Sequence, residues 1–121
     1  MWKIVTTDKF AAWFAGQDDG DRAAILAAIL AAMLVLEKRG PGLPRPYADT
    51  VKGSRYTNMK ELRIQSRGQP IRAFFAFDPE RRGVLLCAGY KTGNEKRFYM
   101  QMIPQADREY TEWLNRPENR S

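Results

Sequence analysis

The sequence contains no histidine and only one cysteine, Cys87, which lies in an apolar run. Without histidine, the commonest acid–base catalyst is missing, so any catalysis must use lysine, arginine, tyrosine or carboxylates. One cysteine can form neither a disulfide within the chain nor a thiolate metal cluster, which leaves only carboxylates for a metal site. This composition fits a reducing, cytoplasmic location best.

The sequence also lacks a long hydrophobic run. The most apolar stretch, Ala23–Leu36, has fourteen residues and is bounded by charged residues on both sides. A membrane-spanning helix needs roughly 20 apolar residues. The first residues, Met1–Phe14, mix charges with aromatics and do not have the pattern of a secretory leader. We therefore predict a buried helix in a cytoplasmic protein that has no membrane partner.

Positive charge is concentrated in the stretch Val51–Tyr99. Between Lys52 and Arg97 eleven Lys and Arg residues stand against four acids, a local net charge of +7, whereas the whole chain carries +6. The pI of about 9.7 indicates a partner that is nucleic acid, an anionic membrane surface or an acidic protein. Charge alone does not choose among these.

The hydrophobic pattern predicts an α+β fold in a single domain, residues 1–121. Strands are expected at residues 2–6, 47–51, 59–65, 71–78 and 84–90, and helices at 9–15 and 19–39. The last three strands should form an antiparallel meander. Thr92-Gly93-Asn94-Glu95 matches a capping box and predicts the start of a last helix, which Pro104 should kink or restart.

The predicted helix at 19–39 has two unlike halves. Most of its alanines occupy one half of the helical wheel, and large apolar residues occupy the other. We expect the large residues to pack on the sheet: Ile25, Leu26, Ile29, Leu30, Met33, Leu34 and Leu36. For the alanine half two interpretations stay open, namely packing against the first helix or against a helix of a partner.

Strand alternation assigns several cations to one face of the sheet. Arg63 and Arg72 interrupt strands that are otherwise largely apolar, and they point away from the expected core. Lys91 has the same parity, and Lys96, Arg97 and Tyr99 should overhang this face from the last helix. Like charges this close are costly unless an anion neutralises them, which makes the face a candidate phosphate site. The alternatives are solvated surface charges, or a simple pair between Arg63 and Glu61.

At these residues the chain resembles the RelE/ParE toxin superfamily, and more closely its phage-derived HigB-like branch. The resemblance rests on the N-terminal helical pair, the connector Gly40–Pro46, and the segments Tyr47–Ser54, Met59–Arg63, Ile71–Asp78 and Gly89–Thr92. It implies a RelE-like microbial RNase fold, with an N-terminal helical hairpin packed on a small, mainly antiparallel sheet and a C-terminal helix. It also implies a type II toxin that enters the 30S A site of the ribosome and cleaves mRNA there. The expected inhibitor is a cognate HigA-like helix-turn-helix antitoxin.

In this family a ribose 2′-OH attacks the adjacent phosphate, a reaction that needs positive charge on the phosphorane and help with proton transfer. The resemblance implies no metal or other cofactor. Catalytic positions carried over from it are Lys60, Arg63, Arg72, Lys91 and Tyr99, and RNA-binding positions are Lys52, Arg55, Lys96 and Arg97. HigB-type members often use histidine. Because this chain has none, deprotonated Lys60 or Tyr99 are the groups left for acid–base work.

Two other functions remain open from the sequence. The first is a non-catalytic inhibitor similar to the ParE branch, which acts on gyrase. The second is a plain RNA-binding phage accessory protein. Converging cations favour the nuclease, because a gyrase inhibitor of that kind would not need a phosphate site.

Overall fold

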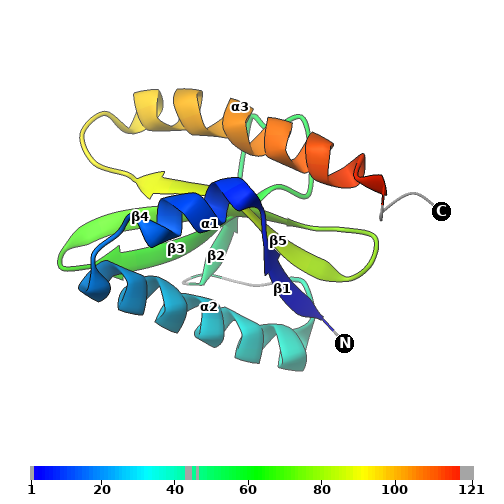
Figure 1. Cartoon of the computed structure of the whole chain (residues 1–121), viewed down its shortest axis with the longest axis horizontal. Coiled ribbons are helices and arrows are strands. Elements are labelled where there is room, and N and C mark those ends of the chain that lie inside the picture. Colours follow the sequence, from blue (N-terminus) through cyan, green and yellow to red (C-terminus); the bar gives the residue numbers. More distant parts are fainter. Residues whose placement is uncertain (1, 43–44, 46, 118–121) are drawn as a thin grey trace.

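The computed structural model describes residues 2–42, 45 and 47–117, and it contains three helices and five strands within them (Figure 1). In chain order these are β1 (Lys3–Thr6), α1 (Asp8–Ala15), α2 (Asp19–Arg39), β2 (Ala48–Thr50), β3 (Lys60–Ser66), β4 (Gln69–Phe77), β5 (Arg82–Tyr90) and α3 (Glu95–Leu114). Every predicted element is present, and the bounds of most differ from the prediction by only one or two residues. Residues 43–44 and 46 of the predicted connector lie outside the described residues.

The strands form one sheet in the order β1-β5-β4-β3-β2. Strands β3, β4 and β5 make the expected antiparallel meander, β2 adds an antiparallel edge, and β1 pairs in parallel with β5. This arrangement confirms the predicted α+β class and the small, mainly antiparallel sheet.

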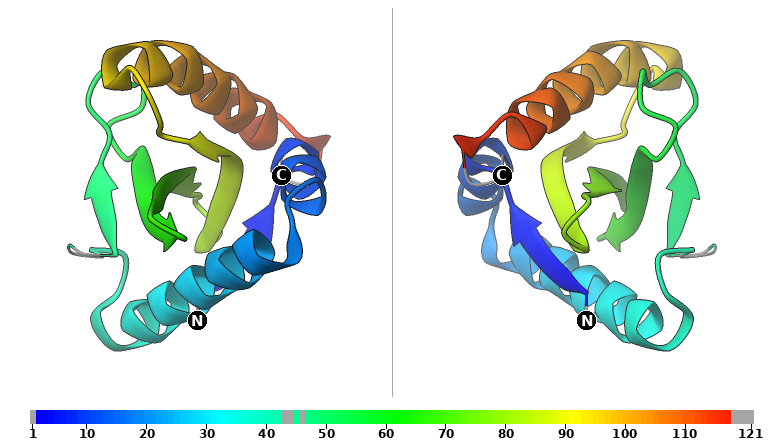
Figure 2. Two further views of the ribbon diagram at one scale, coloured as in Figure 1. Left: turned by 90° about the vertical axis from the view of Figure 1, so that its left-hand side faces the viewer. Right: turned by 90° about the vertical axis from the view of Figure 1, so that its right-hand side faces the viewer.

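Helices cover both faces of the sheet (Figure 2). On one face α1 and α2 enclose a core to which Ile25, Leu62 and Phe75 belong. On the other face α3 covers a second core, which contains Phe74 and Phe98. Since both faces are buried, a polar side chain that points toward α3 enters a covered environment.

The expected packing of α2 is wrong for three of its large residues. Leu26, Leu30 and Leu34 are 50%, 60% and 62% exposed, whereas Ala32 is buried with Ile25 against the sheet. A helix can bury only one stripe on a sheet, and here the buried stripe lies between the two halves of the wheel. The shape of the sheet surface favours a small side chain of α2 close to β3. This shape, and not the size of the side chain, therefore decides which residues of α2 are buried.

Two further details differ from the prediction. A β-bulge between Phe74 and Phe75 of β4 pairs these neighbours with Cys87 and Leu85, so the side-chain alternation of β5 shifts at this point. In addition, α3 is one helix that runs through Pro104 and is capped by Asn94, whose side chain accepts from the backbone N–H of Arg97. No helix within the described ranges is long and apolar enough to cross a membrane.

Candidate active site

The sheet register brings Arg63 and Arg72 together on the face covered by α3. The two residues are direct partners across β3 and β4, while their neighbours Leu62 and Ala73 belong to the opposite core. Like charges directly opposite in an antiparallel pair are unfavourable. A counter-charge on the same face is therefore needed.

Glu61 supplies this counter-charge. Its Oε1 lies 3.5 Å from Nε of Arg72, and both side chains are buried, with exposures of 8% and 6%. Arg72 also donates from Nη1 to the carbonyl of Ile71 at 3.1 Å, but its buried Nε has no hydrogen-bond partner. The pairing is thus looser than the two-bond geometry that arginine prefers with a carboxylate. Arg72 therefore retains an unused hydrogen-bond donor, Nε, with which it can bind an anion.

Tyr99, in the first turns of α3, completes this cluster. Its hydroxyl donates to Oε1 of Glu61 at 2.6 Å. Burial, followed by this hydrogen bond and the charge of Glu61, raises the pKa of Tyr99 above its ordinary value. In this arrangement the phenol acts as a hydrogen-bond donor to Glu61.

Glu61, Arg63 and Tyr99 border an open cavity of about 690 Å³ between α3, the β2–β3 edge and the loop after β5, whereas Arg72, buried beside Glu61, does not line it. Lys91 reaches it after β5, pairs with Glu95 at 3.1 Å, and lies 5.7 Å from the ring centre of Tyr99. The residues that line the cavity are Arg45, Asp49, Thr50, Val51, Lys52, Glu61, Arg63, Lys91, Glu95 and Tyr99. Four of the ten are cations and three are acids, and two of the cations, Arg45 and Lys91, are ion-paired with Asp49 and Glu95, which leaves Lys52 and Arg63 for a bound anion.

Other predicted site residues lie elsewhere. Lys60 pairs with Phe75 and therefore lies on the opposite face of the sheet, away from the Arg72 cluster. Lys96 and Arg97 are exposed in the first turn of α3 and do not border the cavity. Arg55 is exposed in the loop before β3, where its guanidinium lies 5.9 Å from the ring centre of Tyr56. The structure thus joins Arg63, Arg72, Lys91, Tyr99 and Lys52 and separates the rest.

Sequence reasoning missed the acidic half of the site. Glu61 was considered only as a partner of Arg63, but its ion pair is with Arg72. Asp49 was not singled out, although the hydrogen bond from Arg45, whose Nε lies 3.1 Å from Oδ2, lowers the pKa of this carboxyl. The available signal was parity, because Glu61 shares the strand face of Arg63 in a run that is otherwise buried.

The acidic side chains of the candidate site do not form a metal-binding group. Among the described residues, no group of three or more Asp, Glu or Cys side chains is arranged to hold a metal ion. What the cluster does hold is a carboxylate next to a phenolic donor, with guanidinium and ammonium groups around them. Such a set can bind a phosphodiester, polarise it and accept a proton.

This fold, with cations converging on the sheet face beneath the last helix, is that of the RelE/ParE-type toxins. The profile of the family described as "Phage derived protein Gp49-like" matches residues 12–111. The chain belongs to this phage-derived, HigB-like family, as its motifs predicted.

Two relatives from Mycobacterium tuberculosis (strain ATCC 25618 / H37Rv) are similar to the chain. The protein named "Putative toxin HigB2" is 43% identical over 108 residues, which make up 88% of this chain and 52% of the relative. The protein named "Putative toxin HigB3" is 47% identical over 89 residues, or 74% of this chain and 76% of the relative. This chain therefore spans about half the length of the first relative and about three quarters of the second.

Proposed function

We propose that this chain is the toxin of a type II toxin–antitoxin system and that it cleaves mRNA in the A site of the ribosome. The observation that carries the proposal is the buried Glu61–Arg72 pair, joined by Tyr99 at the edge of a cation-lined cavity. The names of the two relatives support the toxin assignment. A helix-turn-helix antitoxin of the HigA type is the proposed partner.

The proposed reaction begins with phosphate binding. Arg63 and Arg72 lie on one strand pair, where the scissile phosphate can accept hydrogen bonds from both guanidinia. Arg72 can turn its free capacity toward this anion because its contact with Glu61 is long. Positive charge fixed here stabilises the phosphorane as its charge develops.

Proton transfer is assigned to Glu61. Its carboxylate removes the 2′-OH proton, the 2′-oxygen forms a bond to phosphorus, and the bond to the 5′-oxygen breaks, which leaves a 2′,3′-cyclic phosphate. Tyr99 orients Glu61 through its hydrogen bond. Lys91 borders the same cavity, and its ammonium group is the proposed proton donor to the leaving 5′-oxygen. Lys60 has no part in this scheme, since it lies on the other face of the sheet.

The test is cleavage of mRNA on programmed ribosomes, read by primer extension. The wild-type chain should give new 3′ ends in the A-site codon, and Arg72→Ala should abolish them and restore growth of expressing cells. Circular dichroism must show that the variant is still folded. Intact mRNA with the wild-type chain, together with inhibited supercoiling by gyrase, would instead support the ParE-like alternative.

A further inference from the structure

The side of α2 that faces away from the sheet carries a row of apolar residues. Of the four large hydrophobic side chains that are exposed in the described part of the chain, three belong to this helix, namely Leu26, Leu30 and Leu34. They follow one another at intervals of four residues, so they lie in one row along the helix. Ala23 and Ala27 are exposed beside them. We call these five residues the leucine stripe, and a contiguous apolar surface of this kind marks an interaction site.

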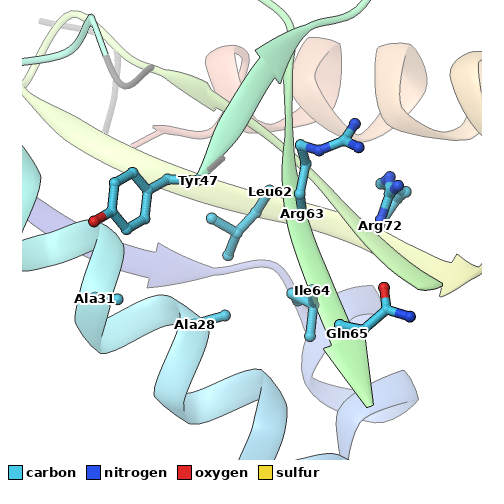
Figure 3. Close-up of a pocket in the computed structure, with 8 residues that line it drawn as sticks. All are labelled: Ala28, Ala31, Tyr47, Leu62, Arg63, Ile64, Gln65 and Arg72. Atoms are coloured by element: carbon cyan, nitrogen blue, oxygen red, sulfur yellow. The ribbon is translucent and has the colours of Figure 1, made fainter. Parts of the chain in front are cut away.

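The other sides of α2 already have neighbours. Ile25 and Leu36 are buried in the core against the sheet. Ala28 and Ala31 point toward β3, where they border a cavity of about 370 Å³ (Figure 3). The middle of α2 is therefore apolar on all sides, a pattern that belongs to helices covered on all sides. Within the described residues, the leucine stripe is the side that lacks a cover.

The charges of α2 favour a second copy of this chain, and not RNA, as the cover. The helix contains three acids and three bases, a net charge of zero, whereas the positive charge of the molecule is concentrated in Val51–Tyr99. The stripe therefore offers no charge to a polyanion, and it does not repel an identical surface.

The two ends of α2 are complementary in charge. Residues 18–22 contain three acids and one base, a net charge of −2, and residues 37–39 contain one acid and two bases, a net charge of +1. When two such helices pack antiparallel, the acidic end of each faces the basic end of the other. In a parallel pair, ends of like charge would meet.

We propose that two copies of this chain pair through the leucine stripe, with their α2 helices antiparallel about a twofold axis at Leu30. Leu26 and Leu34 lie one turn before and one turn after Leu30, so Leu26 of each copy contacts Leu34 of the second copy, and Leu30 contacts its own equivalent. Ala23 and Ala27 are short, which lets the two helices approach closely. Such a contact uses the same patch on both copies and is complete with two.

This pairing leaves the candidate active site open. Helix α2 covers the face of the sheet opposite to α3 (Figure 2), and no residue of the leucine stripe lines the cavity of about 690 Å³. Both cavities of the dimer therefore remain accessible. The dimer does not rest on the proposed function, and its test needs no cleavage assay.

The dimer should be weak and should depend on concentration. A contact confined to one helix of each copy falls at the low end of interface sizes, below roughly 1,200 Å². In sedimentation equilibrium, the mass of the full chain should therefore rise from 13.9 kDa at about 1 µM toward twice that value at about 300 µM.

Leu30→Glu tests the centre of the contact. It places two carboxylates next to each other at the twofold axis, so this variant should associate at least about tenfold more weakly than the wild type. Met100→Glu is the matched control, because Met100 is a large hydrophobic side chain that is 67% exposed on α3, and this variant should associate as the wild type does. Leu30 is 60% exposed, so Leu30→Glu should stay folded, and urea unfolding at about 1 µM, where the chain is single, checks this.

Cysteine cross-linking tests the antiparallel direction. Under mild oxidation a mixture of Leu26→Cys and Leu34→Cys should form a disulfide between the two variants, whereas each variant alone should not, because its own equivalent lies two turns away. The native Cys87 is buried and does not interfere. Ala12→Cys, at an exposed position of α1, measures cross-linking by random collision.

Three results would each overturn the proposal. A chain that stays at 13.9 kDa up to about 300 µM would show that the stripe does not bind a second copy and belongs to another partner. Equal association of Leu30→Glu and Met100→Glu would place the contact elsewhere on the surface. Cross-linking of Leu26→Cys with itself, above the level of Ala12→Cys, would show a parallel pair. Dimers of the expected geometry without any mRNA cleavage would refute the proposed function alone.

Discussion

Replacing Glu61 by glutamine separates a catalytic carboxylate from a structural one. The change keeps the shape and an oxygen that can accept from Tyr99, but it removes the charge that faces Arg72 at 3.5 Å. Leaving a buried cation without its partner costs about 3–5 kcal/mol of folding free energy. Loss of a general base slows the chemical step by about 10²–10⁴-fold, which corresponds to roughly 3–5 kcal/mol in the barrier.

The two losses are measured independently. Urea unfolding gives the stability of Glu61→Gln, and single-turnover cleavage of ribosome-bound mRNA, corrected for the folded fraction, gives the rate. RNA affinity should be equal or higher, because the site becomes more positive. A Glu61→Gln protein that cleaves within threefold of the wild-type rate would refute the role of this carboxylate as the base, whatever its stability.

Three further predictions follow from the same contacts. Tyr99→Phe also removes a group that contacts Glu61. In a double-mutant cycle, the change in cleavage barrier caused by Tyr99→Phe and Glu61→Gln together should therefore differ from the sum of the two single changes by about 0.5–3 kcal/mol. Additive changes would show that the two residues do not act together. Hydrogen bonds from Ser66 and Tyr90 lower the pKa of Asp21 to about 2, from an ordinary value near 3.9. The stability from Asp21 is therefore complete above about pH 4 and lost as the pH falls toward 2, and thermal melts of Asp21→Asn should lack this part of the acid sensitivity. On α2, Ile25→Ala should cost about 2–5 kcal/mol, because Ile25 is fully buried, whereas Leu30→Gln at a 60% exposed position should change urea stability by less than about 0.5 kcal/mol.

Local pattern predicted the elements well because each has a strong local cause. Turn-forming residues separate the strands of the meander, and Gly40 ends α2 with a positive φ of 74°. The buried stripe of α2 was beyond prediction because both halves of the wheel are apolar, so only the surface of the sheet could decide between Ala32 and Leu30. The bulge in β4–β5 likewise depends on pairing across strands.

The candidate site was predictable in its charges and not in its pairing. Parity placed Arg63 and Arg72 on one face, and the register confirms it. It could not show that Glu61 would choose Arg72, since that depends on how far each side chain reaches beneath α3. The same parity places Lys60, three residues before Arg63, on the face away from this cluster, so only the family resemblance had put Lys60 in the candidate site.

The lack of histidine gives the Glu61–Arg72 contact a particular consequence for the proposed reaction. When a phosphate binds, Arg72 must divide its hydrogen bonds between that anion and Glu61, and the hold on the carboxylate weakens. In the proposed reaction Arg72 therefore releases Glu61 from the ion pair only once the phosphodiester is in place. A long contact of 3.5 Å, with Nε unbonded, suits this exchange better than a tight pair, which would have to be broken first.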